Sequence, residues 1–498
     1  MPYDQRDERK IRQISLGLSV QVGELTAAEI ACEKRKVADL SDMQASLLSI
    51  TPRWPHKFHL QACPYPMVVP EKLLYDLSIF HKSLDAAITN IVERWWTDEG
   101  ACFPNKMPLE SQVEEILRWM DDQSEEWVPK YRKCQGSWRP DFLLDANENF
   151  RMCEINARFP FNLLLHTAFC QQAYIDMDNK TDPLTTPGAQ PAKIYNSLFR
   201  LFDPSSSLHL LKGTETGLDI HQFVSYIQLV TGRKPLLLEP SELRLVDDRH
   251  SPTGFALHCV IGVDIQGNER LERIYQVGLE LTQHELRSLS PAMLREISRC
   301  CFNDFRTIFL VHDKRMLGIV LQELNNLVEV QKILTVQQAD VLRRGIAPTM
   351  IPGSREIANL LSASQISPGI RKDFVIKPIG GGKGDGIIFG SDTTPASWIS
   401  QLERMQRSEL LPGDKSCVVQ RRIEQPKFGV VLDSSNGVQQ NYLVGTYLSI
   451  HGGYQGLGPW RISPDRICAL SAGGWWVGSV LPAKKTFSVK PLNVKARL

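Results

Sequence analysis

The sequence predicts a mixed α/β protein with more than one domain, and three patterns favour this fold class. Residues 206–240 read as a strand, an amphipathic helix and a second strand, the pattern of a β-α-β unit. Residues 139–158 and 373–390 each read as a strand, a turn or loop, and another strand. Residues 73–95 carry apolar side chains every third or fourth position, like one face of a long helix. With 498 residues, the chain can hold two or three domains.

The composition is that of a globular protein, with 42% hydrophobic and 23% charged residues. Because the formal net charge is +1, we expect neither nucleic acid nor a membrane as a partner. The polar N-terminus does not resemble a signal peptide. The eleven cysteines show no CxxC spacing, and we interpret them as reduced thiols. We therefore expect a cytoplasmic protein. A peroxisomal location is the alternative, because the chain ends in Ala496-Arg497-Leu498.

Residues 1–135 are expected to form an N-terminal helical part. Helix-forming residues fill about 25–50, a proline-rich connector follows, and further helices are predicted over 73–95 and 109–120. The apolar face of the helix over 73–95 indicates burial in a core, so its tryptophans need no functional interpretation.

The hairpin that follows carries a candidate metal site. On an extended strand, residues two apart point to the same face, so Glu154 and Asn156 present two oxygen ligands side by side. Asp141, near the start of the partner strand, is a third candidate. Oxygen ligands of this kind suit Mg²⁺, which fills its other positions with phosphate and water. For this strand alone, a solvated strand face is the alternative; a phosphate site beside it favours the metal.

Residues 205–305 are expected to form an α/β domain around the β-α-β unit, with more strands and a helix over 283–300. Because this range contains no dinucleotide-binding fingerprint, we assign it to substrate positioning. The run that starts at Thr307 reads as a buried strand leading into Lys314 and Arg315. Such a basic pair can reach a nucleotide phosphate, although an ordinary charge at a helix entry is the alternative.

The glycine-dense stretch DFVIKPIGGGKGDGIIFG, residues 373–390, reads as two strands joined by a flexible loop. Glycine lets the backbone adopt positive φ and approach an anion closely, while Lys377 and Lys383 add positive charge. The loop is not a P-loop, because Gly384 follows Lys383 where that motif needs Ser or Thr. We interpret it as a loop that covers phosphates; a glycine-rich surface hairpin is the alternative.

Three segments after the glycine loop complete the list of candidates. Residues 416–423 read as a strand whose backbone can face an adenine. Arg461 and the segment 471–476 lie among strands interrupted by glycine loops.

In this order, the motifs resemble the ATP-grasp superfamily, and within it the circularly permuted, eukaryotic glutathione synthetase-like group. Glu154-Ile-Asn156 resembles the E-x-N magnesium strand, and as in that group it precedes FVIKPIGGGKG by more than two hundred positions. Arg139-x-Asp141 resembles the R-x-D strand of the group. Lys314 and Lys377 resemble its two ATP-binding lysines, and CVVQRRI its adenine-hinge strand.

The resemblance implies an α/β (α+β) ATP-grasp fold, circularly permuted, with an inserted Rossmann-like substrate domain and a glycine-rich lid. The corresponding domains are a helical part over 1–135 and ATP-grasp strands with the magnesium motif over 136–204. A substrate-binding domain over 205–305 follows, and then the ATP-grasp domain with its lid and closing loops over 306–498. The group also implies a homodimer.

The resemblance further implies a role for each candidate residue. The catalytic residues are Arg461 and Arg139, and the metal ligands are Glu154, Asn156 and Asp141. The ATP contacts are Lys314, Lys377, Gly380, Gly381, Gly382, Lys383, Gly384, Gln420, Arg421 and Ile423. The substrate contacts are Arg158, Ser471, Ala472, Gly473, Gly474 and Trp475.

The function implied is an ATP-dependent carboxylate-amine ligase that uses ATP and Mg²⁺ to join a small carboxylate and an amine, such as amino acids, through an acyl phosphate. Three departures distinguish the chain from this group. The hinge has Gln420, Arg421 and Arg422 where the family tends to have Met, Glu and Lys. Ile379 stands where glutathione synthetases carry an acidic magnesium ligand, and Trp475 and Trp476 replace small residues. We expect the ATP chemistry to carry over and the substrates to differ. An ATP-dependent small-molecule kinase and a non-catalytic nucleotide-binding protein are the alternatives.

Overall fold

The computed structural model describes residues 10–16, 20–21, 61–178, 185–215, 217–411, 413, 416–432 and 437–483. The helix expected near 25–50 and the tripeptide Ala496-Arg497-Leu498 lie outside these residues. Within them, no helix combines the length and apolar character that crossing a membrane requires.

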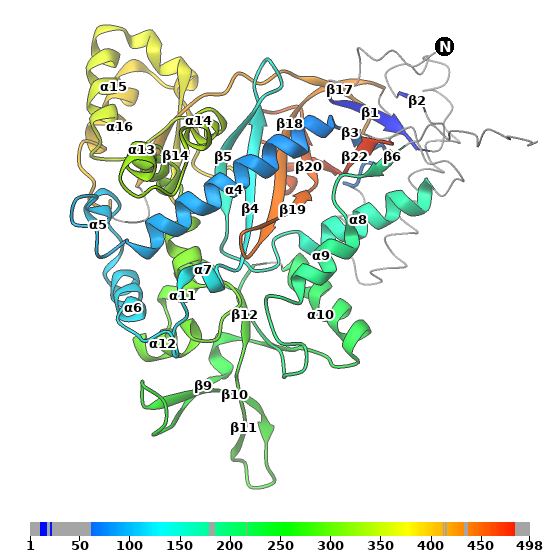
Figure 1. Cartoon of the computed structure of the whole chain (residues 1–498), viewed down its shortest axis with the longest axis vertical. Helices are drawn as coiled ribbons and strands as arrows, with labels where there is room; N and C mark the ends of the chain where they lie inside the picture. Colours follow the sequence, from blue (N-terminus) through cyan, green and yellow to red (C-terminus); the bar gives the residue numbers. More distant parts are fainter. Residues whose placement is uncertain are drawn as a thin grey trace, which may run out of the picture.

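The centre of the molecule is a seven-stranded sheet in which the path β21-β20-β18-β4-β5 joins strands from residues 137–156 to strands from residues 439–477 (Figure 1). The predicted hairpin is present as β4 (Ser137–Leu144) and β5 (Phe150–Asn156). The other edge of β4 pairs with β18 (Gln439–Ile450), which is far away in sequence. The remaining strands are β17 (Phe428–Val430), β19 (Gly453–Leu457), β20 (Trp460–Ser463) and β21 (Trp475–Val477).

The predicted long helix is α4 (Glu71–Glu93), which crosses in front of the central sheet in Figure 1. Its apolar face is buried, with Leu77, Phe80 and Leu84 fully inaccessible to solvent, as the three-to-four-residue spacing predicted. The second predicted helix is α6 (Ser111–Asp121), and two short helices, α5 (Phe103–Lys106) and α7 (Tyr131–Cys134), complete this part.

A small second sheet has the order β2-β1-β3-β22-β6. Its strands are β1 (Arg12–Ser15), β2 (Val20–Gln21), β3 (Met67–Val68), β6 (Thr185–Pro187) and β22 (Ser479–Pro482). The helices expected between 163 and 200 are α8 (Leu164–Met177) and α9 (Pro191–Leu198).

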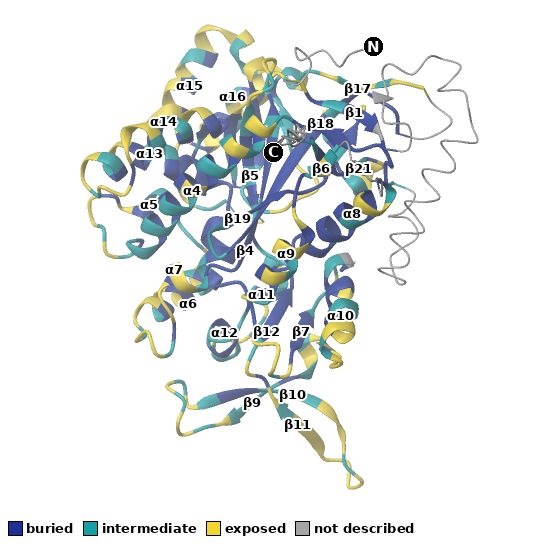
Figure 2. Ribbon diagram, turned by 45° about the vertical axis from the view of Figure 1, so that its right-hand side comes forward, coloured by how far each residue is buried: buried dark blue, intermediate teal, exposed yellow. Residues whose placement is uncertain are grey.

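The predicted β-α-β unit is present as β7 (His209–Lys212), α10 (Leu218–Thr231) and β8 (Leu236–Leu238), and the two strands are parallel. A third parallel strand, β12 (Val277–Glu280), pairs with the other edge of β7. Helices α11 (Gln283–Arg287) and α12 (Pro291–Ser298) follow. Strands β9 (Leu243–Asp247), β10 (Phe255–Val263) and β11 (Glu269–Arg273) form an arm that projects from the body, and β11 and the end of β10 are mostly exposed (Figure 2).

The prediction of a strand that starts at Thr307 is wrong. Residues Thr307–Val311 form a π-helical turn that leads into α13 (Arg315–Glu329). All five side chains of the turn are buried, and a short apolar run does not distinguish a buried strand from a buried helical turn. Lys314 nevertheless lies at the start of a helix, because it is the N-cap of α13.

The glycine-dense stretch lies in a four-stranded sheet of order β13-β16-β14-β15. Strands β14 (Phe374–Pro378) and β15 (Ile388–Phe389) form the expected hairpin, and β16 (Cys417–Arg421) pairs with β14. The other elements here are β13 (Thr349–Met350), α14 (Val336–Gly345), α15 (Arg355–Ile366) and α16 (Pro395–Arg404).

The tight packing of the central sheet gives a prediction at Gly445 in β18. A Cβ at this position would lie 2.3 Å from Phe142 Cζ and 2.7 Å from Trp460 Cζ3. Gly445→Ala should therefore lower the free energy of unfolding by about 1–3 kcal/mol, the usual cost of overpacking a core. Denaturant unfolding measures this loss.

Gly369→Ala is the control for Gly445→Ala, because a Cβ there meets no atom within 4 Å. Its unfolding free energy should stay within about 0.5 kcal/mol of wild type. Equal losses in the two variants would contradict the packing described for β18.

Candidate functional site

The hairpin of β4 and β5 brings the predicted metal ligands together. Asp141 lies opposite Glu154, and Arg139 lies opposite Asn156. The side-chain amide of Asn156 donates from Nδ2 to Asp141 Oδ2 over 2.9 Å. Because the amide nitrogen of Asn156 makes this hydrogen bond, its amide oxygen is still available as an acceptor.

Asp141 links the hairpin to the far end of the chain through Arg461 on β20. Asp141 is fully buried, and Arg461 donates to its Oδ2 over 2.6 Å. Arg139 lies on the same strand with a guanidinium nitrogen 3.9 Å from that oxygen. The other oxygen, Asp141 Oδ1, has no hydrogen-bond partner among the described residues. Both predicted catalytic arginines therefore flank the same carboxylate.

Two lysines from other elements approach the same place. Lys314 Nζ lies 3.6 Å from Glu154 Oε2 and donates to the carbonyl oxygen of Gly381 over 3.2 Å. Lys377, on β14, donates to Gln420 Oε1 on β16 over 2.8 Å. The two lysines are only 7% and 8% exposed, so their charges are held close to the site.

The cations control the ionisation of Glu154. Burial alone would raise the pKa of this carboxyl, but Lys314, Lys377 and Arg461 together hold it well below its usual range. Glu154 is therefore ionised at neutral pH and available as a ligand.

His312 supports the site from behind β5. Burial, followed by the charges of Lys314 and Arg158, lowers the pKa of His312 to about 3, so the ring is neutral. Its Nδ1 lies 3.2 Å from the carbonyl oxygen of Ile155, the residue between the two predicted ligands. The ring thus contacts the backbone that positions Glu154 and Asn156.

The donor set suits magnesium better than a transition metal. Glu154, Asn156 and the unpartnered Asp141 Oδ1 supply oxygen atoms only, which Mg²⁺ prefers. The described residues contain no group of three or more His, Cys, Asp or Glu side chains that could hold a metal ion by themselves. These residues therefore fit a Mg²⁺ ion that takes its other ligands from phosphate and water.

The glycine loop contacts two other segments of the chain, one at Ile467 and one at Glu215. Gly384 has φ +83°, and a Cβ there would lie 2.3 Å from Ile467, so this position requires glycine. Lys383 Nζ lies 3.2 Å from Glu215 Oε2, in the loop between β7 and α10. Arg158 lies 3.3 Å from the other oxygen of Glu215. Glu215 therefore joins the glycine loop to the hairpin side of the site.

Several predicted residues lie outside this cluster of charges. Arg421 points away, with 56% of its side chain exposed and its guanidinium over the ring of Phe374. Trp475 pairs with Ile462 on the edge of the central sheet. The roles of the remaining predicted positions stay predictions; these positions are Gly380, Gly382, Ile423, Ser471, Ala472, Gly473 and Gly474.

The sequence did not single out Glu215, Asp219 or Glu280. All three lie at the carboxyl ends of β7 and β12 or at the start of α10. Polar residues directly after a strand in a β-α-β unit are the signal that indicates such a position.

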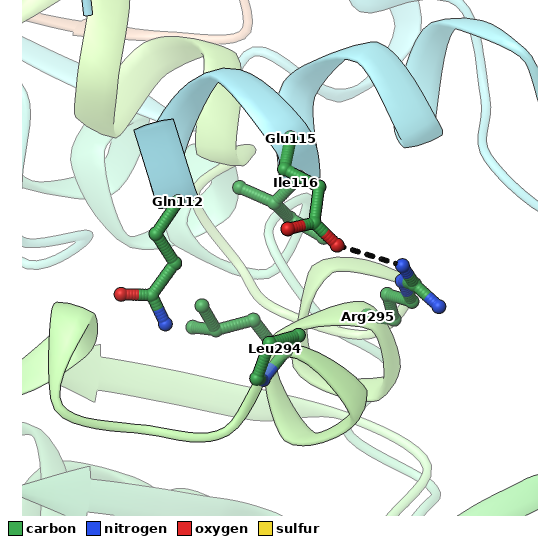
Figure 3. Close-up of a pocket in the computed structure, with 6 residues that line it drawn as sticks. Gln112, Glu115, Ile116, Leu294 and Arg295 are labelled. Atoms are coloured by element: carbon green, nitrogen blue, oxygen red, sulfur yellow. Dashed lines mark hydrogen bonds and ion pairs between the residues drawn. The ribbon is translucent and has the colours of Figure 1, made fainter. Parts of the chain in front are cut away.

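A shallow pocket lies elsewhere, between α6 and α12 (Figure 3). Glu115 and Arg295 form an ion pair of 2.9 Å across it, and Gln112 donates to the carbonyl oxygen of Leu289. Since Ile116 and Leu294 fill its floor, we interpret the pocket as a seam between packed helices.

Comparison with known proteins identifies the family. The chain is 36% identical over 436 residues to the "ATP-grasp enzyme ankG" of Aspergillus thermomutatus, covering 84% of this chain and 88% of that protein. The chain belongs to the ATP-grasp enzymes. Residues 80–310 of this ATP-grasp enzyme also match the family described as the AnkG N-terminal domain.

A solved structure agrees on the fold. The chain is similar to a glutathione synthetase-like effector, GSS30, from Globodera pallida in its apo form, with a TM-score of 0.50 and 12% identity. The match covers 90% of this chain and 97% of the effector. The predicted glutathione synthetase-like ATP-grasp fold is therefore confirmed, while the circular permutation stays a prediction.

The site gives a prediction for Glu154. Glu154→Gln removes the ionised oxygen ligand and should lower magnesium-dependent ADP release by a factor on the order of 100, since charge stabilisation by a metal contributes several kcal/mol. The fold should persist, because the side chain is 23% exposed and is not a core contact. ADP release and far-UV circular dichroism measure the two effects.

Glu403→Gln, on the exposed face of α16, is the control and should match wild type in both measurements. Near-normal turnover of Glu154→Gln at saturating magnesium would show that Glu154 is not a metal ligand.

Proposed function

We propose that the protein is an ATP-dependent carboxylate-amine ligase. ATP phosphorylates a carboxylate substrate, an amine attacks the acyl phosphate, and an amide, ADP and phosphate leave. One observation supports this proposal above the others: the basic side chains in the site outnumber the acidic ones. Lys314, Lys377, Arg461 and Arg139 surround only Asp141 and Glu154. Such a surplus of buried positive charge suits a polyphosphate together with a substrate carboxylate.

The lysines are the groups that would hold the phosphates. Lys314 and Lys377 enter from two different elements and stand beside Glu154, so together they can neutralise charge on a transferred phosphoryl group. Gly381 places the glycine loop directly over Lys314. In phosphoryl transfer, positioning and electrostatic stabilisation of this kind supply most of the catalysis.

Glu154 and Asn156, with Asp141 beside them, would hold Mg²⁺, which when bound supplies additional neutralisation of the phosphate charge. Asp141 also keeps Arg461 in place through its 2.6 Å ion pair. The pair leaves the remaining N–H groups of Arg461 available to a substrate carboxylate, for which a planar guanidinium is well suited.

The glycine loop would protect the acyl phosphate from water. Lys383 contacts Glu215, and Gly384 lies so close to Ile467 that an added Cβ would clash with it, so the loop is held against two other segments of the chain. Excluding water from the site prevents hydrolysis of the reactive intermediate.

An isotope experiment tests the proposed reaction after a screen of amino acids, other carboxylates and amines for ADP release. With an ¹⁸O-labelled carboxylate, one labelled oxygen should appear in inorganic phosphate, because the acyl phosphate breaks between carbon and the bridging oxygen. Mass spectrometry of phosphate and nucleotide measures the label.

Two results would contradict the ligase. Label in AMP would indicate an adenylating enzyme. Amine-independent formation of a stable phosphorylated product would indicate a kinase.

A further inference from the structure

The carboxyl edge of the small parallel sheet faces the ATP-grasp site. Strands β12, β7 and β8 are parallel, and open α/β sheets bind ligands at the carboxyl ends of their strands. The backbone N–H of Leu163 donates to Asp219 Oδ2 over 3.1 Å, in the first turn of α10. Together with the Arg158 to Glu215 ion pair, this contact fixes the edge against the segment that follows the magnesium hairpin.

Glu280, the last residue of β12, is a buried carboxyl that forms no ion pair with any of the described residues. The residue is only 5% exposed, and its Oε2 has no hydrogen-bond partner in the part of the chain that the structure describes. Its other contact is the backbone N–H of Ile220, which donates to the carboxyl group. Asp219 Oδ1 is also buried without a partner among the described residues.

Lys212 does not form an ion pair with Glu280, although its charge lowers the pKa of that carboxyl. Lys212 lies opposite Glu280 in the register of β7 and β12. Its Nζ donates instead to the carbonyl oxygens of Gly213 and Glu215, over 3.1 and 2.7 Å. Buried charges in proteins are normally paired, so Glu280 is neutral until a cation reaches it.

The protonation of Glu280 agrees with this geometry. Burial first, and then the negative charge of Asp219, raise the pKa of Glu280 to about 8, while Lys212 lowers it and Glu215 raises it. At pH 7 the carboxyl therefore holds a proton in the absence of a ligand.

We propose that Glu280 and Asp219 form a binding site for an alkylammonium group of the amine substrate. The inference rests on the proposed ligase, because that reaction needs an amine next to the phosphate site. On binding, the Glu280 carboxyl releases its proton to solvent and the resulting carboxylate accepts hydrogen bonds from the ammonium group. The charge of the site stays balanced, since one positive charge enters as one proton leaves.

A metal ion fits this place less well than an ammonium group. Lys212 and Arg158 contribute positive charge near Glu280, and a divalent ion needs about six oxygen ligands. A single positive charge with three N–H donors matches two unpartnered oxygen atoms.

The test is calorimetric titration of the full-length protein at pH 7 with butylammonium chloride, without ATP. Titration in two buffers of different ionisation enthalpy gives the number of protons released, which should be about one per cation bound to wild type. Glu280→Gln should weaken binding roughly tenfold and abolish proton release, since one charge-assisted hydrogen bond is lost. Equal concentrations of sodium chloride and of 1-butanol should give no binding.

Two further variants keep the result interpretable. Asp219→Asn keeps an oxygen for the Leu163 N–H and should also weaken binding, so it serves if Glu280→Gln does not fold. Glu296→Gln changes a buried glutamate that pairs with Arg299 on α12, and it should bind butylammonium like wild type.

No binding by wild type, binding without proton release, or equal affinities in wild type and Glu280→Gln would overturn the proposal. Because the titration contains no ATP and no turnover, its failure would not contradict the proposed ligase, which the isotope experiment tests separately. A failed isotope experiment would likewise leave the measured cation site intact.

Discussion

The ion pair between Asp141 and Arg461 is the interaction on which the site depends. A fully buried carboxylate requires a partner, and here the partner comes from β20 at the other end of the chain. The pair fixes β4 against the C-terminal strands, and Asn156 then takes its orientation from the same carboxylate. Removing either member would leave an uncompensated charge in the centre of the main sheet, a change that typically costs about 3–5 kcal/mol.

A second layer of positive charge is built on this pair. Lys314 begins a helix and Lys377 lies on the strand before the glycine loop, yet both act on the same carboxyl, Glu154. Gln420 holds Lys377 and also contacts the Cys153 carbonyl, so it joins the glycine-loop sheet to the central sheet. The electrostatic character of the site therefore arises from residues that are far apart in the sequence.

Motif spacing predicted that Glu154 and Asn156 lie on the same face of a strand, because they are two residues apart and strand geometry fixes their common face. The prediction of a strand at Thr307–Val311 is wrong, because a short buried run has no periodicity that distinguishes a strand from a helical turn. Asp219 and Glu280 were not found because they meet only through the pairing of β7 with β12. Their proximity is a property of tertiary structure that no local pattern carries.

The position of β4 has a consequence for synthesis of the protein. Its pairing with β5 is local, but its pairing with β18 joins residues near the middle of the first half of the chain to residues close to the C-terminus. During translation, the edge of β4 that pairs with β18 stays unpaired until β18 has been synthesised, which takes on the order of 15 to 60 seconds at ordinary elongation rates. An unpaired strand edge is a template for wrong pairing between chains. The newly made hairpin is thus a segment that a chaperone would protect during synthesis.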